Sequence, residues 1–159
     1  DAIEWQPMHK AVRDLFIESR TGQSIWAFKD PRTLLTLGGW FDVLPQLECA
    51  GIFRHPAEVA MSIHKRNQFP IEKCQDIWCA YNQKLLDYHR QRAFPLIEFV
   101  GDEATMASSF SRMIEALRLA QNAPDRAFFE AGMKHQDRPD IALSSRAMDI
   151  YAALKALAI

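Results

Sequence analysis

The stretch AGIFRHPAEVAMS, residues 50–62, decides the fold, because a short apolar run passes here into a helical pattern. Residues 47–53 form the apolar run, which is interrupted only at Glu48 and Gly51, as is typical of a buried strand. An arginine, a histidine and a proline then end the run. Apolar side chains recur at helical spacing over residues 57–65. The stretch therefore predicts a strand, a polar turn and a helix.

The same alternation of short apolar runs and helical patterns continues on both sides of this stretch. Apolar residues at steps of three and four predict helices, and short apolar runs that end at proline or glycine predict strands. Upstream we expect a helix over residues 7–20, a strand over 25–28 and a helix over 32–44. Downstream we expect a helix over 71–92, a strand over 95–100, a helix that carries Met106 to Leu117, and a last helix through Ile150 to Leu157.

Strands that are separated by helices pair in parallel through crossover connections. We therefore expect one α/β domain over residues 1–159, with a three-layer parallel sheet flanked by helices. In such sheets ligands bind beyond the carboxyl ends of the strands. The segments at those ends are Lys29-Asp30-Pro31-Arg32, Arg54-His55-Pro56 and Gly101-Asp102-Glu103.

The composition excludes several classes of function. The 159 residues carry 19 Lys and Arg against 20 Asp and Glu, a formal charge of -1. We expect no nucleic-acid partner, because sequence-independent binding depends on many cations that meet phosphates. No apolar run approaches the ~20 residues that span a bilayer, so we expect no membrane insertion. The three cysteines show no C-x-x-C spacing, which predicts reduced thiols and a cytoplasmic location.

Two of the three predicted strand ends are basic although the whole chain is nearly neutral, which favours an anionic ligand. Arg54 ends a strand, and Ser62 lies eight residues further on, in the following helix. Arginine binds phosphate through two parallel hydrogen bonds, and a hydroxyl adds another. A second interpretation stays open, in which Arg54 pairs with a carboxylate and Ser62 faces water.

These residues resemble a known family. The segments WAFKDPR (residues 26–32) and AGIFRHPAEVAMS (50–62) look like the central part of the sulfotransferases that use 3'-phosphoadenosine 5'-phosphosulfate (PAPS). The resemblance is closest to bacterial members related to protein-tyrosine and carbohydrate sulfotransferases. It covers residues 25–155, weakly after residue 62, and it implies a P-loop NTPase-like fold.

The resemblance also implies roles for individual residues. In the family an R-x-P-x-x-x-x-x-S element binds the 3'-phosphate of the donor, and Arg54 and Ser62 match it. Lys29 matches the lysine near the sulfuryl group, which makes it the catalytic candidate, and Arg32 belongs to the same K-D-P-R element. Lys134 and Arg138 fall in a segment that resembles a late basic element of the family, so both are candidates for donor binding, although a solvated loop is the alternative.

The family's first element, a strand, a Gly/Ser/Thr-rich loop and a helix that hold the 5'-phosphosulfate, does not precede Lys29. We therefore expect either a fragment of a longer enzyme or a chain that has lost catalysis. The first alternative predicts sulfuryl transfer from PAPS to a hydroxyl or amine of a small molecule, carbohydrate or peptide, with 3'-phosphoadenosine 5'-phosphate (PAP) as product and no metal. The second predicts an inactive module that binds a nucleotide or a partner. A small-molecule kinase would require a G-K-[ST] loop, which the sequence lacks.

Overall fold

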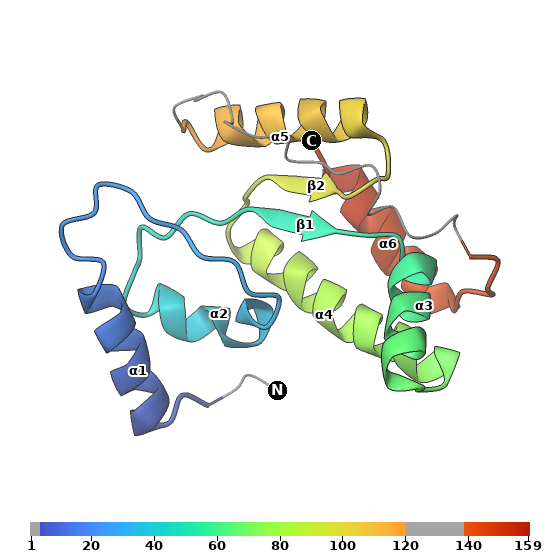
Figure 1. The fold of residues 1–159 in the computed structure, drawn as a ribbon, viewed down its shortest axis with the longest axis horizontal. Coiled ribbons are helices and arrows are strands. Elements are labelled where there is room, and N and C mark those ends of the chain that lie inside the picture. Colours follow the sequence, from blue (N-terminus) through green and yellow to red (C-terminus); the bar gives the residue numbers. More distant parts are fainter. Residues whose placement is uncertain (1–3, 120–138) are drawn as a thin grey trace. The chain divides into compact units, whose positions relative to one another are not determined.

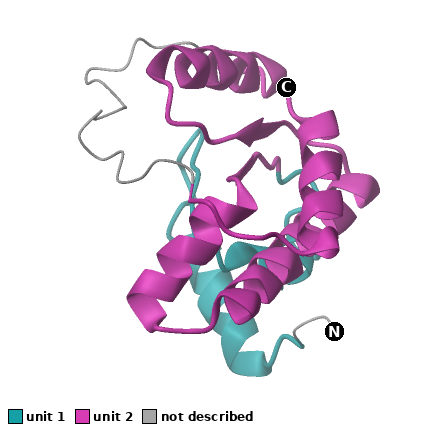
Figure 2. Cartoon of the chain, turned by 90° about the vertical axis from the view of Figure 1, so that its right-hand side faces the viewer, with its two compact units in different colours: residues 1–47 teal, residues 48–159 magenta. Residues whose placement is uncertain are grey.

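The computed structural model describes residues 4–119 and 139–159, and helices make up 59% of this part of the chain. The chain divides into two compact units, Asp1–Leu47 and Glu48–Ile159 (Figure 2). The first unit contains helices α1 (Pro7–Glu18) and α2 (Thr33–Phe41). The second contains strands β1 (Gly51–Phe53) and β2 (Leu96–Glu98) with helices α3 (Pro56–Asn67), α4 (Ile71–Gln91), α5 (Glu103–Ala116) and α6 (Ser145–Leu157).

The first unit is held together by aromatic side chains. Phe16 of α1 lies edge-on to Trp26 and Phe28, with ring centroids 5.8 Å apart in both pairs. The ring of Phe28 also lies 4.8 Å from that of Trp40 in α2. Buried aromatic rings contribute large apolar areas and prefer such tilted or edge-on contacts. The segment between the two helices is thus fixed by its side chains.

In the second unit, β1 and β2 pair in parallel, with Ile52 opposite Ile97. The connection between them contains α3 and α4, as parallel pairing requires (Figure 1). Two further backbone bonds involve end residues of the strands, of which the first extends the pairing and the second joins β2 to the C-terminal residue. The amide of Phe99 donates to the carbonyl of Phe53 at 2.7 Å, and the amide of Ile159 donates to the carbonyl of Leu96 at 2.9 Å.

The core of the second unit lies where α4 meets the strands, α3 and α6. Helix α4 is amphipathic, so one face is buried along its whole length. The buried side chains of this core include Phe53, Ala60, Cys74, Trp78, Cys79, Leu85, Leu86, Leu96, Ile97, Ile150 and Leu154.

The helix starts follow local rules. The imidazole Nδ1 of His55 accepts the amide of Ala57 at 3.2 Å, and Pro56 occupies the first helical position of α3. Asp102 caps α5 by accepting the amide of Thr105 at 2.8 Å, and Ser144 caps α6 in the same way. All the predicted helices are confirmed, with ends that move by a few residues.

The expected fold class is wrong. Only two short strands pair in the described part of the chain, so the molecule is mostly helical and has no three-layer P-loop NTPase-like sheet there. The predicted strand over residues 25–28 is absent, because its aromatic side chains pack on α1 and α2 and its backbone has no strand partner. A strand needs a neighbour, and an apolar run alone does not supply one.

None of the helices in the described ranges is long and apolar enough to cross a membrane.

Candidate functional site

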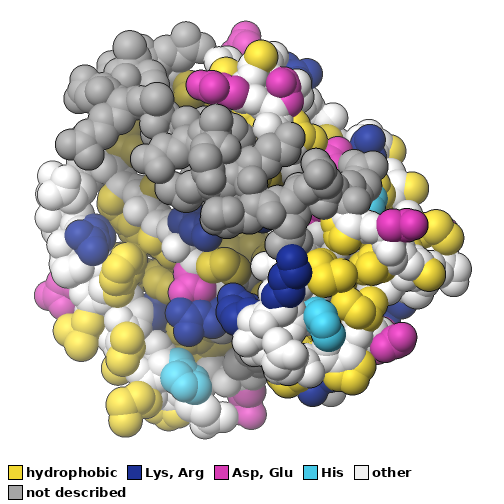
Figure 3. Space-filling view, turned by 45° about the vertical axis from the view of Figure 1, so that its right-hand side comes forward, with side chains coloured by type: hydrophobic (Ala, Val, Ile, Leu, Met, Phe, Trp, Pro, Cys, Tyr) yellow, Lys and Arg dark blue, Asp and Glu magenta, His cyan; other side chains and the backbone are white. Residues whose placement is uncertain are grey.

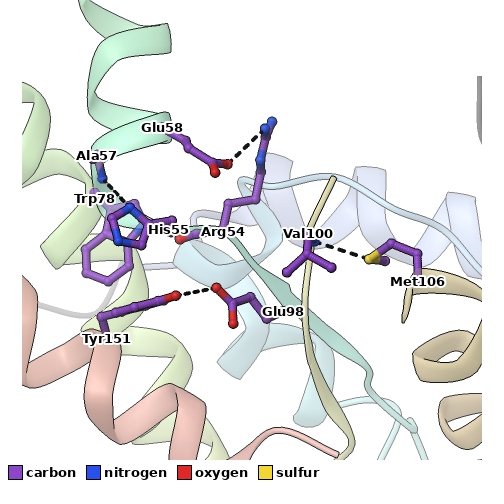
Figure 4. A network of polar contacts seen from close by, with 9 residues as sticks. All are labelled: Arg54, His55, Ala57, Glu58, Trp78, Glu98, Val100, Met106 and Tyr151. Carbon is purple, nitrogen blue, oxygen red and sulfur yellow. Dashed lines mark hydrogen bonds and ion pairs between the residues drawn. The ribbon is translucent and has the colours of Figure 1, made fainter. Parts of the chain in front are cut away.

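The turn from β1 into α3 places Arg54 at the carboxyl end of β1, immediately before the capped start of α3. The guanidinium of Arg54 is half exposed, at 51% of its full accessible surface. One Nη atom lies 3.2 Å from a carboxylate oxygen of Glu58 in the first turn of α3 (Figure 4). The other side of the guanidinium lies over the ring of Phe99, at 4.9 Å from its centroid. The aromatic ring and the carboxylate together orient the cation.

The backbone beneath Arg54 is fixed by a buried tryptophan. Trp78 of α4 is 2% exposed, and its indole N–H donates to the carbonyl of Arg54 at 3.1 Å. A backbone carbonyl that is withdrawn from water needs a hydrogen-bond donor, and the indole of Trp78 supplies one at the end of the strand. Trp78 thus belongs to the core and also positions the residue after β1.

Ser62 lies in α3, one helical turn beyond Glu58. Glu58 and Ser62 are four residues apart in the helix and therefore share a face, with Ser62 one turn beyond Glu58. The hydroxyl of Ser62 is exposed and has no hydrogen-bond partner within the described ranges. The structure therefore joins Arg54 to Glu58 by an ion pair and places Ser62 on the same helix face as Glu58. This is the arrangement that the second interpretation of the sequence predicted, in which Arg54 pairs with a carboxylate and Ser62 faces water.

A second group of polar side chains lies beside this turn. Glu98 at the end of β2 accepts a hydrogen bond from the phenol of Tyr151 in α6 (Figure 4). Lys155, one turn further along α6, lies 3.8 Å from the other oxygen of Glu98. The ring of Tyr151 meets the imidazole of His55 edge-on, with centroids 4.8 Å apart. The residue that caps α3 and the residue that ends β2 therefore both contact α6.

Sequence reasoning missed Glu58, Glu98 and Tyr151. Glu98 carried a signal, because it is the only charged residue in the apolar run of residues 95–100. Glu58 also carried one, four residues after Arg54 and in the first turn of a predicted helix. Tyr151 carried none, since only the packing of α6 against β2 brings it to Glu98.

Lys29 and Arg32 belong to the other unit, at the end of the segment that precedes α2. Arg32 binds Asp30 through its backbone amide at 2.8 Å and through Nε at 3.0 Å. A third bond joins its Nη2 to the second carboxylate oxygen at 2.6 Å. These bonds, the side-chain bonds first, lower the pKa of Asp30 from its usual 3.8 to about 2. Lys29 is exposed and lowers this pKa slightly through its charge.

Replacing Arg32 with alanine should return the pKa of Asp30 part of the way towards 3.8, because the side-chain bonds to its charged form are lost while the backbone bond remains. A carboxyl whose pKa is lowered on folding stabilises the folded chain above its usual pKa. This contribution is lost as the pH falls from about 3.8 to about 2. A carbon-detected NMR titration of the Asp30 carboxyl measures the shift. Arg20→Ala is the matched control, since Arg20 lies over Phe16. An unchanged midpoint in Arg32→Ala would contradict the assignment.

The remaining candidates are the late basic residues, possible metal ligands and the cysteine thiols. Lys134 and Arg138 lie outside the described residues. Within the described ranges, no group of three or more His, Cys, Asp or Glu side chains could hold a metal ion. Burial raises the pKa of the Cys49 and Cys79 thiols, which keeps both protonated near neutral pH. The face drawn in Figure 3 exposes cationic, acidic and hydrophobic side chains.

No protein-family model matches the chain, and neither a search of the curated proteins nor one of the solved structures finds a match. The chain's own residues must therefore carry any assignment of function.

Proposed function

We propose that the chain is a PAPS-dependent sulfotransferase, which transfers a sulfuryl group from PAPS to a hydroxyl or amine of an acceptor. The observation that carries the proposal is the pair Arg54 and Ser62. The two residues match the R-x-P-x-x-x-x-x-S element one for one, with Arg54 directly after β1 and Ser62 within α3. The proposal depends on this local element and not on the architecture of the whole chain.

The 3'-phosphate of the donor is the group that we assign to Arg54 and Ser62. A guanidinium donates two parallel hydrogen bonds to a phosphate, and such charge-assisted bonds are stronger than neutral ones. The half-exposed Arg54 side chain is reachable from solvent, and Phe99 supports its flat face. The free hydroxyl of Ser62 is available to donate one further bond. By the same resemblance, Arg32, Lys134 and Arg138 are further donor contacts.

Glu58 opposes an anion at this position, because its carboxylate lies against the same guanidinium. Replacing Glu58 with glutamine should therefore tighten the binding of PAP about two- to fivefold, since a like charge near the phosphate is removed. Isothermal titration calorimetry measures the change. Glu72→Gln is the matched control, because Glu72 also stands in the first turn of a helix, α4. Equal affinities in both variants would show that Glu58 does not face the ligand.

Lys29 is the residue to which the resemblance assigns the transfer step. The acceptor oxygen or nitrogen forms a bond to sulfur while the bond from sulfur to the 5'-phosphate oxygen breaks, and PAP leaves. The acceptor proton passes to a base or to water. Lys29 would stabilise the negative charge that develops on the bridging oxygen, and a cation placed where charge develops lowers the barrier.

The acceptor is a small molecule, a carbohydrate or a peptide in this proposal, and the reaction takes place in the cytoplasm. The cysteines support the compartment, because Cys49, Cys74 and Cys79 are all free thiols. Free thiols are typical of reducing compartments.

The proposal is tested by titrating the chain with PAP and, separately, with 5'-AMP, which lacks the 3'-phosphate. We expect PAP to bind at least tenfold more tightly, because only PAP offers a group for Arg54 and Ser62. Equal affinities would place no 3'-phosphate site on the chain and would contradict the proposal. Preferential binding of PAP without sulfuryl transfer to phenols, sugars or peptides would assign the chain to the inactive binding module.

A further inference from the structure

The first unit contains a cavity of about 720 Å³, whose lining includes Lys29 and Arg32. Every residue that lines it belongs to Asp1–Leu47. Its volume falls within the ~300–1,000 Å³ that is usual for pockets that bind small molecules. The cavity is therefore large enough for a ligand of one or two fused rings.

Four aromatic side chains, those of Trp5, Phe16, Phe28 and Trp40, line one part of the cavity. Phe28 and Trp40 lie with their centroids 4.8 Å apart, and Phe16 lies 6.0 Å from Trp40. Trp5 meets Trp40 edge-on at 6.1 Å. Gly39 permits this approach, because a Cβ at Gly39 would lie 2.1 Å from the indole nitrogen of Trp5. Rings at such distances and angles offer both faces and edges to a flat aromatic guest.

The charges around the cavity are unequal. Arg13, Lys29 and Arg32 line it, against Asp30 as the one acidic side chain among the lining residues. Arg13 is buried and is engaged by Asp14 and by the carbonyl of Gly39. Arg32 is paired with Asp30.

Lys29 differs from the two arginines. Its ammonium group forms no hydrogen bond or ion pair with any residue in the ranges that the structure describes. Lys29 is exposed and lines the cavity. An anionic group on a ligand could therefore pair with the ammonium group of Lys29, which forms no ion pair with a carboxylate in the described part of the chain.

From these observations we infer that the first unit binds a planar aromatic molecule that carries one anionic oxygen group, such as a carboxylate or sulfate. The ring system lies in the cavity against Phe16, Phe28 and Trp40, and the anion meets Lys29. An aliphatic chain would forgo the ring contacts, and an aromatic cation would meet repulsion from the excess positive charge. This binding site shares Lys29 with the proposed sulfuryl transfer, but the inference goes beyond that reaction and stands on the cavity of the first unit alone.

The inference is tested with three probes that share a naphthalene ring. The chain is titrated calorimetrically with 2-naphthoate, which is anionic, with 2-naphthalenemethanol, which is neutral, and with 2-naphthylmethylammonium, which is cationic. We expect affinity to fall in that order, with about a threefold to tenfold step from the anion to the neutral compound. Hexanoate, an anion without a ring, should bind more weakly than 2-naphthoate.

Two variants locate the site. Lys29→Met should abolish the preference for 2-naphthoate over 2-naphthalenemethanol, while Lys10→Met, which removes a charge from α1 outside the cavity wall, should keep it. Thr36→Phe places a ring in the cavity and should weaken both compounds at least tenfold. Circular dichroism verifies that each variant remains folded, and should Thr36→Phe unfold, the comparison of the two lysine variants decides.

Several results would overturn the inference. Equal affinities for the three naphthalene probes would exclude recognition of the anion, and equal affinities for hexanoate and 2-naphthoate would exclude recognition of the ring. Loss of the preference in Lys10→Met as well as Lys29→Met would point to a general effect of charge. No binding of 2-naphthoate at millimolar concentration would exclude the site. Arg54→Ala should leave 2-naphthoate binding unchanged, so this test and the PAP titration fail independently.

Discussion

Replacing Arg54 with alanine is expected to weaken the binding of PAP about ten- to hundredfold. A hydrogen bond to a charged group contributes roughly 1.5–3 kcal/mol, and this range corresponds to that loss of affinity. The variant removes the guanidinium that the 3'-phosphate would contact, together with its ion pair to Glu58. The backbone carbonyl that Trp78 binds remains. Calorimetry with PAP measures the effect, and binding of 5'-AMP should change little because it has no 3'-phosphate.

Two further variants make this prediction specific. Arg54→Lys keeps the charge but loses the planar fork, so its affinity for PAP should lie between those of the parent and Arg54→Ala. Arg90→Ala is the matched control, because Arg90 is also exposed and pairs with a carboxylate, that of Asp87 at 3.0 Å. An affinity for PAP that is unchanged in Arg54→Ala, or reduced equally in Arg90→Ala, would remove Arg54 from the proposed donor site.

Replacing Trp78 with alanine is expected to lower the free energy of unfolding of the second unit by about 3–5 kcal/mol. Large-to-small changes in a core lose both transfer free energy and packing around the cavity that remains. Trp78 is 2% exposed and reaches from α4 to the end of β1. Urea unfolding followed by circular dichroism measures the loss.

Trp78→Phe separates packing from hydrogen bonding. Phenylalanine keeps most of the apolar volume but leaves the carbonyl of Arg54 without its indole donor. We expect a loss of about 1–3 kcal/mol, which is the usual effect of one unsatisfied polar group. Trp78→Phe should also weaken PAP binding slightly, because Arg54 is held less firmly. Losses below 1 kcal/mol in both variants would show that the residue packs less tightly than its burial indicates.

The helices were predictable because their determinants are local. Apolar spacing predicted α4 over residues 71–92 against the observed Ile71–Gln91. The end of α2 was placed three residues too late, although Pro45 disfavours helical geometry at Leu44. Hydrogen bonds within a helix join residues four apart, so a window of sequence contains both partners.

The strands were less predictable because their partners are distant. The runs at residues 47–53 and 95–100 do pair in parallel, over Gly51–Phe53 and Leu96–Glu98. The run at residues 25–28 looked equally apolar, yet its side chains pack on helices. An apolar run records that a segment is buried, and its pairing depends on which other backbone lies beside it.

The sequence by itself determined the helices, the cap of α3 at His55 and Pro56, and the position of Arg54 after a strand. Only the tertiary structure decided that Trp78 holds the carbonyl of Arg54, that Tyr151 reaches Glu98, and that aromatic rings from α1, α2 and the segment between them line a common cavity. The physical reason is distance along the chain. Capping and helical periodicity act within a few residues, whereas these contacts join groups brought together by the packing of whole elements.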